Sequence, residues 1–256
     1  IMIGAGNLAT SLAVALTDAG HDILQVYSRT MQSAQTLATI AGGAAVTDIS
    51  QVRADADVYI LSVKDDALPV LIPQLCRGRE DKLFLHTAGS VSIDVFQGMA
   101  RHYGVFYPMQ TFSRQKRVSF EEIPCFIEGS GEEETAAIEA LASLLSHRVY
   151  RLSSEARKYL HLSAVFACNF VNHCYAISAE LLEKHGIPFD VMLPLIDETA
   201  AKVHQMAPKD AQTGPAVRYD ENVIRAQSQL LKNNPLVKDI YDRMSMNIHR
   251  LSEERN

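Results

Sequence analysis

The chain has 256 residues, of which 47% are hydrophobic and 21% charged, and its formal net charge is −6 at pH 7. This composition is typical of a globular protein and excludes a disordered or low-complexity one. The negative charge excludes nucleic acid as a general partner, because no basic stripe is present to neutralise phosphates. The densest basic cluster, Arg114, Lys116 and Arg117, is short and is interpreted as a solvated loop.

The four cysteines, Cys76, Cys125, Cys168 and Cys174, show no C-x-x-C spacing. The pattern indicates neither a metal site nor a disulfide framework, so we expect buried, reduced thiols in a cytoplasmic protein. No signal peptide is visible. Three apolar residues before the first glycine are few for a core strand, so further residues are expected upstream of the first position.

The chain opens with an apolar strand, residues 1–3, that enters a Gly-x-Gly-x-x-Ala turn. Gly4 permits the tight turn, Gly6 lets the backbone approach a pyrophosphate, and Ala9 lets a helix over residues 10–19 pack closely on the strand. The phosphates would rest on the free N–H groups of that helix, where the macrodipole favours negative charge. The alternative is an ordinary glycine-rich turn of another α/β protein. The residues expected to bind a dinucleotide here are Gly4, Gly6, Asn7 and Leu8.

A second strand, residues 22–27, ends at Ser28, Arg29 and Thr30. NAD enzymes usually carry an acidic residue at this point to bind the ribose 2′-hydroxyl, and this chain has none. A guanidinium between two hydroxyls suits a 2′-phosphate instead, because arginine can bind phosphate in bidentate fashion. The segment therefore predicts NADP(H) as the cofactor. The alternative is that Arg29 is a solvated loop residue.

Strands and helices continue to alternate as far as residue 152. Further strands are expected at residues 44–46, 57–63, 82–89, 104–109, 125–128 and 147–152. Helices are expected at residues 31–40, 67–75, 90–99 and 132–145, the second of them capped by an aspartate of the Asp65 and Asp66 pair. This alternation predicts a doubly wound α/β domain of the Rossmann type, with a parallel sheet, over residues 1–152.

Ligands of open α/β sheets bind at the carboxyl ends of the strands. Three such ends should flank the cofactor, the last two of them nearest the nicotinamide. The first two are expected to supply Ser62, Val63, Lys64, Thr87, Ala88 and Gly89 to the cofactor. The third, after Tyr107, is expected to supply Pro108 and Gln110 to the substrate. His86 is a candidate proton carrier, although an imidazole within a core strand is more often structural.

From residue 153 to 256 only helical periodicity is present, which predicts an all-α second domain with helices at residues 155–184, 188–206, 221–231 and 235–252. Residues 159–179 contain no Asp, Glu, Lys or Arg. The segment nevertheless holds two histidines and two asparagines, which are costly in lipid. We therefore expect a helix buried in a helical core or a dimer interface, and no membrane span.

A polar stripe follows this long helix. At 100° per residue, His161, Cys168, Asn172 and Tyr175 fall within about 60° of one another, with Asn169 beside them. In the functional interpretation His161 carries a proton while hydride moves, Asn169 orients a substrate oxygen or nitrogen, and Asn172 contacts the substrate. A hydrogen-bonded interface between helices is an equal alternative for His161 and the favoured one for His173.

A loop that contains Thr213, Gly214 and Pro215 places Arg218 two residues before Asp220. The guanidinium of Arg218 is a candidate for binding a substrate carboxylate. The alternative, slightly favoured by the sequence, is an internal Arg–Asp pair that fastens the start of the next helix.

These motifs together resemble a superfamily in which a Rossmann domain precedes an all-helical domain. It includes pyrroline-5-carboxylate reductase, 6-phosphogluconate dehydrogenase-like β-hydroxyacid dehydrogenases and deazaflavin-dependent NADP oxidoreductases. The opening turn and the Ser28 to Thr30 segment look most like the reductase, which uses a similar Asn-Arg-Thr for NADP. A narrower resemblance is to an uncharacterised bacterial family, Rossmann-like with a C-terminal domain of unknown function. The stretches that carry it are His86 to Ser90, Tyr107 to Phe112, His161 to Asn169 and Thr213 to Pro215.

The chain departs from the better-known relatives at two places. β-Hydroxyacid dehydrogenases carry a catalytic Lys with an Asn four residues later, whereas Lys158 is followed at that spacing by Leu162. The mechanism of those dehydrogenases therefore does not transfer to this chain. The reductase's Ser-Gly-x-Gly-Pro stretch for its substrate is absent as well, which argues against proline synthesis. The resemblance also implies a homodimer formed through the helical domains.

The leading hypothesis is an NADP(H)-dependent oxidoreductase that acts on a small carbonyl, hydroxy acid or imine. A second hypothesis is a non-catalytic NADP-binding sensor that signals through its helical domain. A third, weaker one uses a deazaflavin as the second redox partner, as one of the relatives does.

Overall fold

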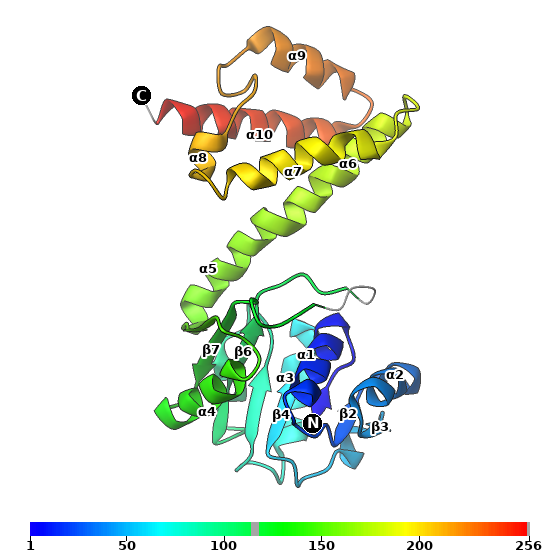
Figure 1. Ribbon diagram of the computed structural model, residues 1–256, viewed down its shortest axis with the longest axis vertical. Coiled ribbons are helices and arrows are strands. Elements are labelled where there is room, and N and C mark those ends of the chain that lie inside the picture. Colours follow the sequence, from blue (N-terminus) through cyan, green and yellow to red (C-terminus); the bar gives the residue numbers. More distant parts are fainter. Residues whose placement is uncertain (114–117, 255–256) are drawn as a thin grey trace. The chain divides into compact units, whose positions relative to one another are not determined.

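The structure, a computed structural model, describes residues 1–113 and 118–254 (Figure 1). The basic cluster of Arg114, Lys116 and Arg117 lies outside the described residues. The chain divides into two compact units, Ile1–Val165 and Phe166–Asn256. Helix α5 (Ser154–Ala164) therefore counts with the first unit, although it begins the all-helical part of the chain.

The first unit is built on an eight-stranded sheet of order β3-β2-β1-β4-β5-β6-β7-β8. The strands are β1 (Met2–Ile3), β2 (Gln25–Tyr27), β3 (Ala44–Val46), β4 (Val58–Leu61), β5 (Leu83–His86), β6 (His102–Pro108), β7 (Cys125–Gly129) and β8 (Val149–Arg151). The Rossmann-type α/β fold expected from the alternating pattern is confirmed. Because β1 lies in the middle of the sheet, its glycine turn opens at the carboxyl edge beside the end of β4.

The prediction of a wholly parallel sheet is wrong for one strand, because β7 runs antiparallel to β6. A parallel neighbour needs a crossover, usually a helix. No helix lies in the described part of the connection between β6 and β7, and its two ends are joined where Met109 N–H donates to the Pro124 carbonyl at 2.9 Å. The chain therefore folds back beside β6. The next strand, β8, is parallel to β7 because α4 (Glu132–Ser143) crosses between them.

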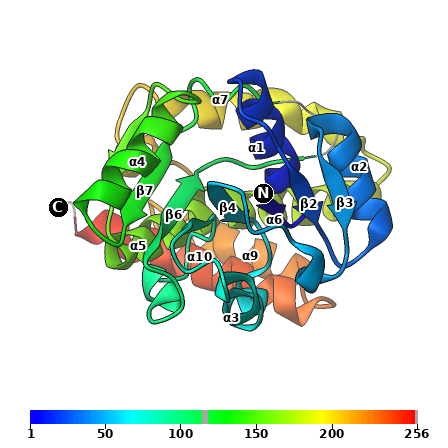
Figure 2. The same ribbon diagram turned by 90° about the horizontal axis from the view of Figure 1, so that it is seen from below.

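Helices cover both faces of the sheet (Figure 2). One face packs against α1 (Asn7–Asp18), α2 (Met31–Ala41) and α4. The other packs against α3 (Leu68–Cys76) and the 3₁₀ helix Ile93–Phe96. Alternate residues of β1 enter opposite cores, Met2 the first and Ile3 the second, as expected of a strand buried on both sides.

Two local predictions are wrong. The helix expected at residues 90–99 is only the 3₁₀ helix Ile93–Phe96, because α5 takes hydrogen-bonding groups of this segment: the Val91 carbonyl accepts from Arg157, and Ile93 N–H donates to Ser154. Neither Asp65 nor Asp66 caps α3, which follows the 3₁₀ helix Asp65–Ala67. The Asp65 carboxylate instead accepts a hydrogen bond from the Ser90 hydroxyl, which ties the turn after β4 to the turn after β5.

The second unit is helical throughout its described elements. They are α6 (Val171–Glu183), the 3₁₀ helix Phe189–Met192, α7 (Leu193–Lys202), α8 (Pro208–Ala211), α9 (Glu221–Leu230) and α10 (Pro235–Glu253). Among its described residues Ala216 alone is a buried apolar residue. The long helix is therefore not buried within this one chain, and Phe166 and Phe170 are 61% and 49% exposed. The expectation of buried thiols holds for Cys76 and Cys125 but is wrong for Cys168, which is exposed.

The long helix is also not uniformly α-helical. A π-helical segment, Val165–Phe170, separates α5 from α6. Turns closed by i→i+5 hydrogen bonds rotate less per residue than α-helical turns do. The polar stripe predicted at 100° per residue is therefore interrupted between His161 in α5 and Asn172 in α6. None of the described helices is long and apolar enough to cross a bilayer.

Candidate functional site

The Gly-x-Gly turn has the shape that a pyrophosphate requires. Gly4 has φ +113°, and a Cβ there would lie 2.1 Å from the Ser62 carbonyl oxygen, so only glycine allows the turn to pack on the end of β4. Gly6 is the N-cap of α1, and a Cβ there would meet no described atom within 4 Å. No side chain caps α1 within the described structure, and its first turn contains no acidic residue. The first N–H groups of α1 therefore remain available to an anion beside open space.

Asn7 and Leu8 contribute to this turn mainly through their backbones. The Asn7 side-chain amide donates to the Phe112 carbonyl at 3.0 Å, which ties the start of α1 to the loop after β6. Leu8 packs, partly buried, against the core beneath α1. Their main-chain N–H groups lie in the first turn of the helix, where a bound phosphate would meet them.

The end of β2 presents Arg29 without a partner among the described residues. Thr30 is the N-cap of α2, since its hydroxyl oxygen accepts from Ser33 N–H, and Ser28 N–H continues the sheet by donating to the Val46 carbonyl. The exposed Arg29 side chain makes no hydrogen bond or ion pair with the residues that the structure describes. Its guanidinium is thus available beside a helix N-terminus that also lacks acidic residues.

The ends of β4 and β5 lie side by side at the same edge of the sheet. Ser62 N–H donates to the Ile3 carbonyl at 2.8 Å and Thr87 N–H to the Leu61 carbonyl at 3.2 Å, so the ladder continues into both turns. Thr87, Ala88 and Gly89 are buried, whereas Lys64 is exposed. Val63 packs against the second core, and its side chain lies beside Gly4.

His161 meets Tyr107 directly above Gly89. The Tyr107 hydroxyl lies 3.1 Å from His161 Nδ1, and the two rings meet edge to face with their centroids 6.0 Å apart. A Cβ on Gly89 would lie 2.5 Å from His161 Nδ1 and 2.9 Å from Tyr107 Cζ. The missing side chain at Gly89 therefore makes room for these two rings. The sequence did not single out Tyr107, and its only signal was its place at the end of a core strand.

His86 is a structural residue and not a proton carrier. Its side chain is fully buried and stacks on Phe96 with the ring centroids 5.8 Å apart. Nδ1 accepts from Ala88 N–H at 3.1 Å, while Nε2 has no hydrogen-bond partner among the described residues. Burial, together with the positive charge of Arg157, lowers the pKa of His86 to about 3 despite a smaller opposing effect of the Ser92 backbone. The ring is neutral at physiological pH.

The turn after β6 holds the two residues expected to contact substrate. Pro108 is buried at the end of β6, and it stiffens the backbone next to Tyr107. Gln110 is exposed, and its side-chain oxygen accepts from Thr111 N–H at 2.8 Å and from the Thr111 hydroxyl at 3.3 Å. The side-chain oxygen of Gln110 is thus bonded within the loop. The side-chain NH2 group makes no hydrogen bond to the described residues and can contact a ligand.

The remaining candidates lie in the second unit. Asn169 is exposed in the π-helical segment and Asn172 is exposed in α6. Arg218 is exposed and makes no ion pair within the described part of the chain, while Asp220 caps α9 by accepting from Val223 N–H at 3.4 Å. The prediction of an internal ion pair between Arg218 and Asp220 is therefore wrong.

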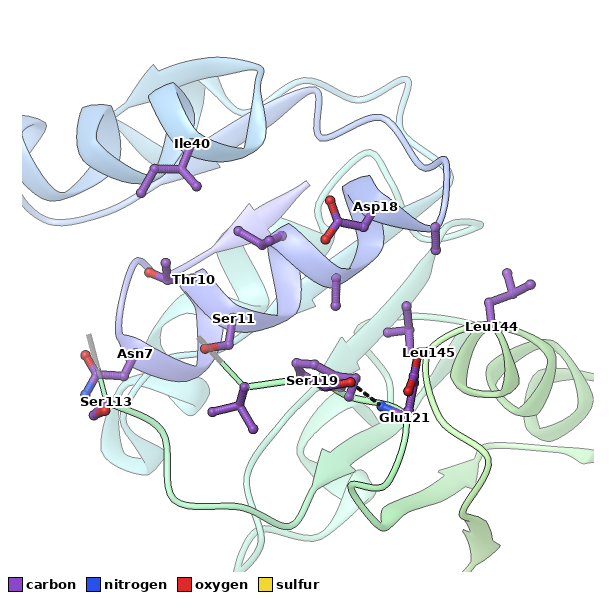
Figure 3. A pocket seen from close by; sticks show the side chains of 15 residues that line it. Asn7, Thr10, Ser11, Asp18, Ile40, Ser113, Ser119, Glu121, Leu144 and Leu145 are labelled. Atoms are coloured by element: carbon purple, nitrogen blue, oxygen red, sulfur yellow. Dashed lines mark hydrogen bonds between the residues drawn. The ribbon is translucent and has the colours of Figure 1, made fainter. Parts of the chain in front are cut away.

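A cavity of about 710 Å³ lies beside α1, and neither Tyr107 nor His161 lines it. Figure 3 shows the side chains that do. Asn7, Thr10 and Ser11 line one side, α2 contributes Ile40, and the turn after α4 contributes Leu145. The titratable side chains that line it among the described residues, Asp18 and Glu121, are both acidic and would repel phosphate. Apart from Asn7, none of the residues expected to bind the cofactor lines this cavity. No cluster of metal-ligating side chains occurs among the residues described.

Each half of the chain matches a known protein family. Residues 1–89 match a family described as "NADP oxidoreductase coenzyme F420-dependent", and residues 123–248 match a domain of unknown function, DUF2520. No curated protein matches the chain.

Solved structures resemble the chain over nearly its full length. A Bacteroides fragilis protein assigned as an NADP oxidoreductase is 55% identical, with 97% of this chain and 96% of that one covered and a TM-score of 0.93. A Thermotoga maritima protein is 22% identical, with 98% of both chains covered and a TM-score of 0.80. An imine reductase from Myxococcus stipitatus in complex with NADP+ is 16% identical, with coverages of 99% and 93% and a TM-score of 0.69. The last two similarities show the fold alone.

Proposed function

We propose that this chain, which belongs to the family of the Bacteroides fragilis NADP oxidoreductase, binds NADP(H) and reduces a small carbonyl or imine compound or oxidises the corresponding hydroxy acid. The observation that carries the proposal is the contact of His161 with Tyr107 at the carboxyl edge of a sheet whose opening turn is shaped for a pyrophosphate. The activities assigned to the relatives are oxidoreductase and reductase activities, and nothing in them supports a non-catalytic sensor.

The cofactor would be held at three places on the sheet edge. Its pyrophosphate would rest on the N–H groups that follow Gly6, and its 2′-phosphate would meet the Arg29 guanidinium and the hydroxyl of Ser28. Thr30 would act indirectly, by capping α2 and holding Arg29 in place. The residues proposed for the nicotinamide half are Ser62, Val63, Lys64, Thr87, Ala88 and Gly89.

When bound, NADPH would supply a hydride to the electrophilic carbon of a C=O or C=N group. A proton must then reach the oxygen or nitrogen for an alcohol or amine to form, and we assign this transfer to His161. In its protonated form the imidazole donates Nδ1–H to the Tyr107 hydroxyl oxygen and delivers the Nε2 proton to the substrate, which leaves a neutral ring. Asn169 is proposed to orient the same substrate atom.

Four residues are proposed to bind the substrate: Pro108, Gln110, Asn172 and Arg218. Arg218 suits a carboxylate because its guanidinium makes no ion pair with the described residues. A keto acid or an imino acid is therefore the first substrate class to test.

A homodimer is proposed from the make-up of the second unit. Domains of this size need a buried apolar core, yet the second unit buries Ala216 and no other apolar residue among those described. Large side chains such as Leu195, Leu230 and Leu236 are 59%, 83% and 79% exposed. A second copy offers the same apolar surface and would cover it, as obligate dimers do. Light scattering should give twice the chain mass of 28.3 kDa, and a monomer at micromolar concentration would contradict the dimer.

The function is tested in two steps. Calorimetry should show tighter binding of NADP+ than of NAD+, and NADPH absorbance should fall in the presence of a member of a panel of keto acids, cyclic imines and a deazaflavin. Failure to bind either nucleotide would reject the cofactor site. Tight NADPH binding without turnover across the panel would reject the proposed reaction and leave the cofactor site standing.

A further inference from the structure

A buried arginine lies one helical turn before His161. Arg157 belongs to α5, and its side chain is fully buried. Its Nη1 donates to Glu128 Oε2 at 2.7 Å, and its Nη2 donates to the Val91 carbonyl at 2.5 Å and to Ser154 Oγ at 3.1 Å. Arg157, Glu128 and Ser154 are called the Arg157 cluster below.

The Ser154 hydroxyl makes every hydrogen bond that a hydroxyl group can make, one as donor and two as acceptor. Its hydroxyl donates to Glu128 Oε2 at 2.6 Å and accepts from Ile93 N–H at 3.1 Å as well as from Arg157. Glu128 comes from β7, whereas Val91 and Ile93 belong to the segment that follows Gly89. The first turn of α5 is therefore bonded both to the sheet and to the chain that leaves the Gly89 turn.

Stability alone does not explain such a cluster. Taking a guanidinium and a carboxylate out of water carries a desolvation penalty that can exceed their mutual attraction, and apolar side chains of similar volume often serve a fold equally well. An apolar contact would leave α5 free to slide or rotate slightly, whereas the four directional hydrogen bonds that leave the helix allow one placement.

We propose that the Arg157 cluster positions His161 for proton transfer, an inference that rests on the proposed function. Residues four apart lie on the same face of an α-helix, so fixing Arg157 also fixes His161. The imidazole must fit above Gly89 and keep the 3.1 Å contact with the Tyr107 hydroxyl, so a small shift of α5 breaks the arrangement. Arg157, Glu128 and Ser154 are positioning residues, because none of them touches His161 in this arrangement.

The test compares four variants with a matched control. Arg157→Met and Ser154→Ala remove hydrogen bonds of the cluster, Tyr107→Phe removes the contact itself, and Glu128→Gln keeps an oxygen that can accept from both partners. Arg151→Met is the control, because Arg151 also pairs with two glutamates in the same unit but is exposed on β8. His161 is followed by NMR in the absence of substrate. Its ring proton resonance is assigned as the one that is missing from the spectrum of His161→Gln.

The resonance of His161 should move in Arg157→Met and in Ser154→Ala in the direction seen for Tyr107→Phe, and stay in place in Glu128→Gln and Arg151→Met. With an active substrate, kcat should fall on the order of 100-fold in Arg157→Met, with NADPH affinity and KM unchanged. An unmoved resonance in both cluster variants overturns the proposal, and Ser154→Ala alone decides if Arg157→Met does not fold. A moved resonance in a protein that reduces no substrate rejects the proposed function and supports the positioning role.

Discussion

Tyr107, the penultimate residue of β6, holds its hydroxyl 3.1 Å from Nδ1 of His161 on α5. The two residues are 54 positions apart in the sequence, and Gly89 at the end of β5 makes room for both rings. One strand end thus supplies the space and a second supplies the hydroxyl that orients the imidazole. The same edge of the sheet carries the glycine turn at the start of α1.

Replacing either member of this pair should impair proton transfer and spare cofactor binding. A positioned general acid typically contributes about 100- to 10,000-fold to the rate, so His161→Gln should lower kcat within that range. Tyr107→Phe keeps the ring but removes the hydroxyl, and should lower kcat less than His161→Gln does. Steady-state kinetics and NADPH titration measure both effects. Unchanged kcat in His161→Gln would remove this residue from the mechanism.

Gly89→Ala should displace His161 without straining the backbone. Gly89 does not have a positive φ, so alanine is allowed there, but its Cβ would lie 2.5 Å from His161 Nδ1 and 2.9 Å from Tyr107 Cζ. We expect a loss of about 1–3 kcal/mol in unfolding free energy from overpacking, together with a fall in kcat.

The control for this substitution is the pair of variants His161→Ala and Gly89→Ala/His161→Ala. If the clash with His161 causes the damage, adding Gly89→Ala to His161→Ala should lower stability and kcat much less than it does in the native background. Equal losses in both backgrounds would mean that Gly89 acts through something other than His161.

The sequence predicted the parts of this arrangement that depend on neighbouring residues, and it failed for those that depend on residues far apart in the chain. The glycine turn, the end of β2 at Ser28 and the helix α2 follow from neighbouring residues, and the structure confirms the strand–turn–helix order there. The direction of β7 was predicted wrongly because it depends on the chain returning beside β6, where Met109 bonds to Pro124. The spacing of apolar residues along the sequence does not indicate this return.

The contacts of His161 were also beyond local patterns. Its helical position was correct, but Tyr107 and Gly89 reach it only through the order of strands in the sheet. The shortened helix after β5 has the same cause, since Ile93 N–H bonds to Ser154 of a distant helix. The π-helical segment changes the rotation per residue, so a stripe drawn through Asn169 and Asn172 at α-helical spacing fails.

Arg29 should decide the choice between the phosphorylated and the plain dinucleotide. A hydrogen bond to a charged group contributes about 1.5–3 kcal/mol, so Arg29→Ala should weaken NADP+ binding by roughly 10- to 100-fold and leave NAD+ binding nearly unchanged. Calorimetry with both nucleotides measures the difference. Arg77→Ala is the control, because Arg77 is exposed at the C-terminal end of α3, on the opposite edge of the sheet. Equal weakening by both variants would indicate a general charge effect.

Gly4 and Gly6 should respond differently to alanine. Gly4→Ala puts a Cβ 2.1 Å from the Ser62 carbonyl at φ +113°, so it should destabilise the fold itself. Gly6→Ala meets no described atom within 4 Å and should lower stability by no more than about 1 kcal/mol, the scale of an N-cap change. Its methyl group would nevertheless occupy the space of the pyrophosphate, so NADP+ affinity should fall sharply. Full NADP+ affinity in Gly6→Ala would place the phosphates elsewhere.

His86 should make the protein less stable as the pH falls. Its folded pKa is about 3 against an ordinary value of 6.5, so between these values the unfolded chain binds a proton that the native chain does not. Stability therefore rises with pH across that window, by up to about 1.4 kcal/mol per pH unit for one group, and His86 carries no such penalty above 6.5. His86→Leu should lose this part of the slope in urea unfolding. It should also cost about 1–3 kcal/mol at neutral pH, because Ala88 N–H loses its acceptor. Replacing the exposed His21 with Gln is the control, and an identical pH slope in native protein and His86→Leu would show that the imidazole is charged in the fold.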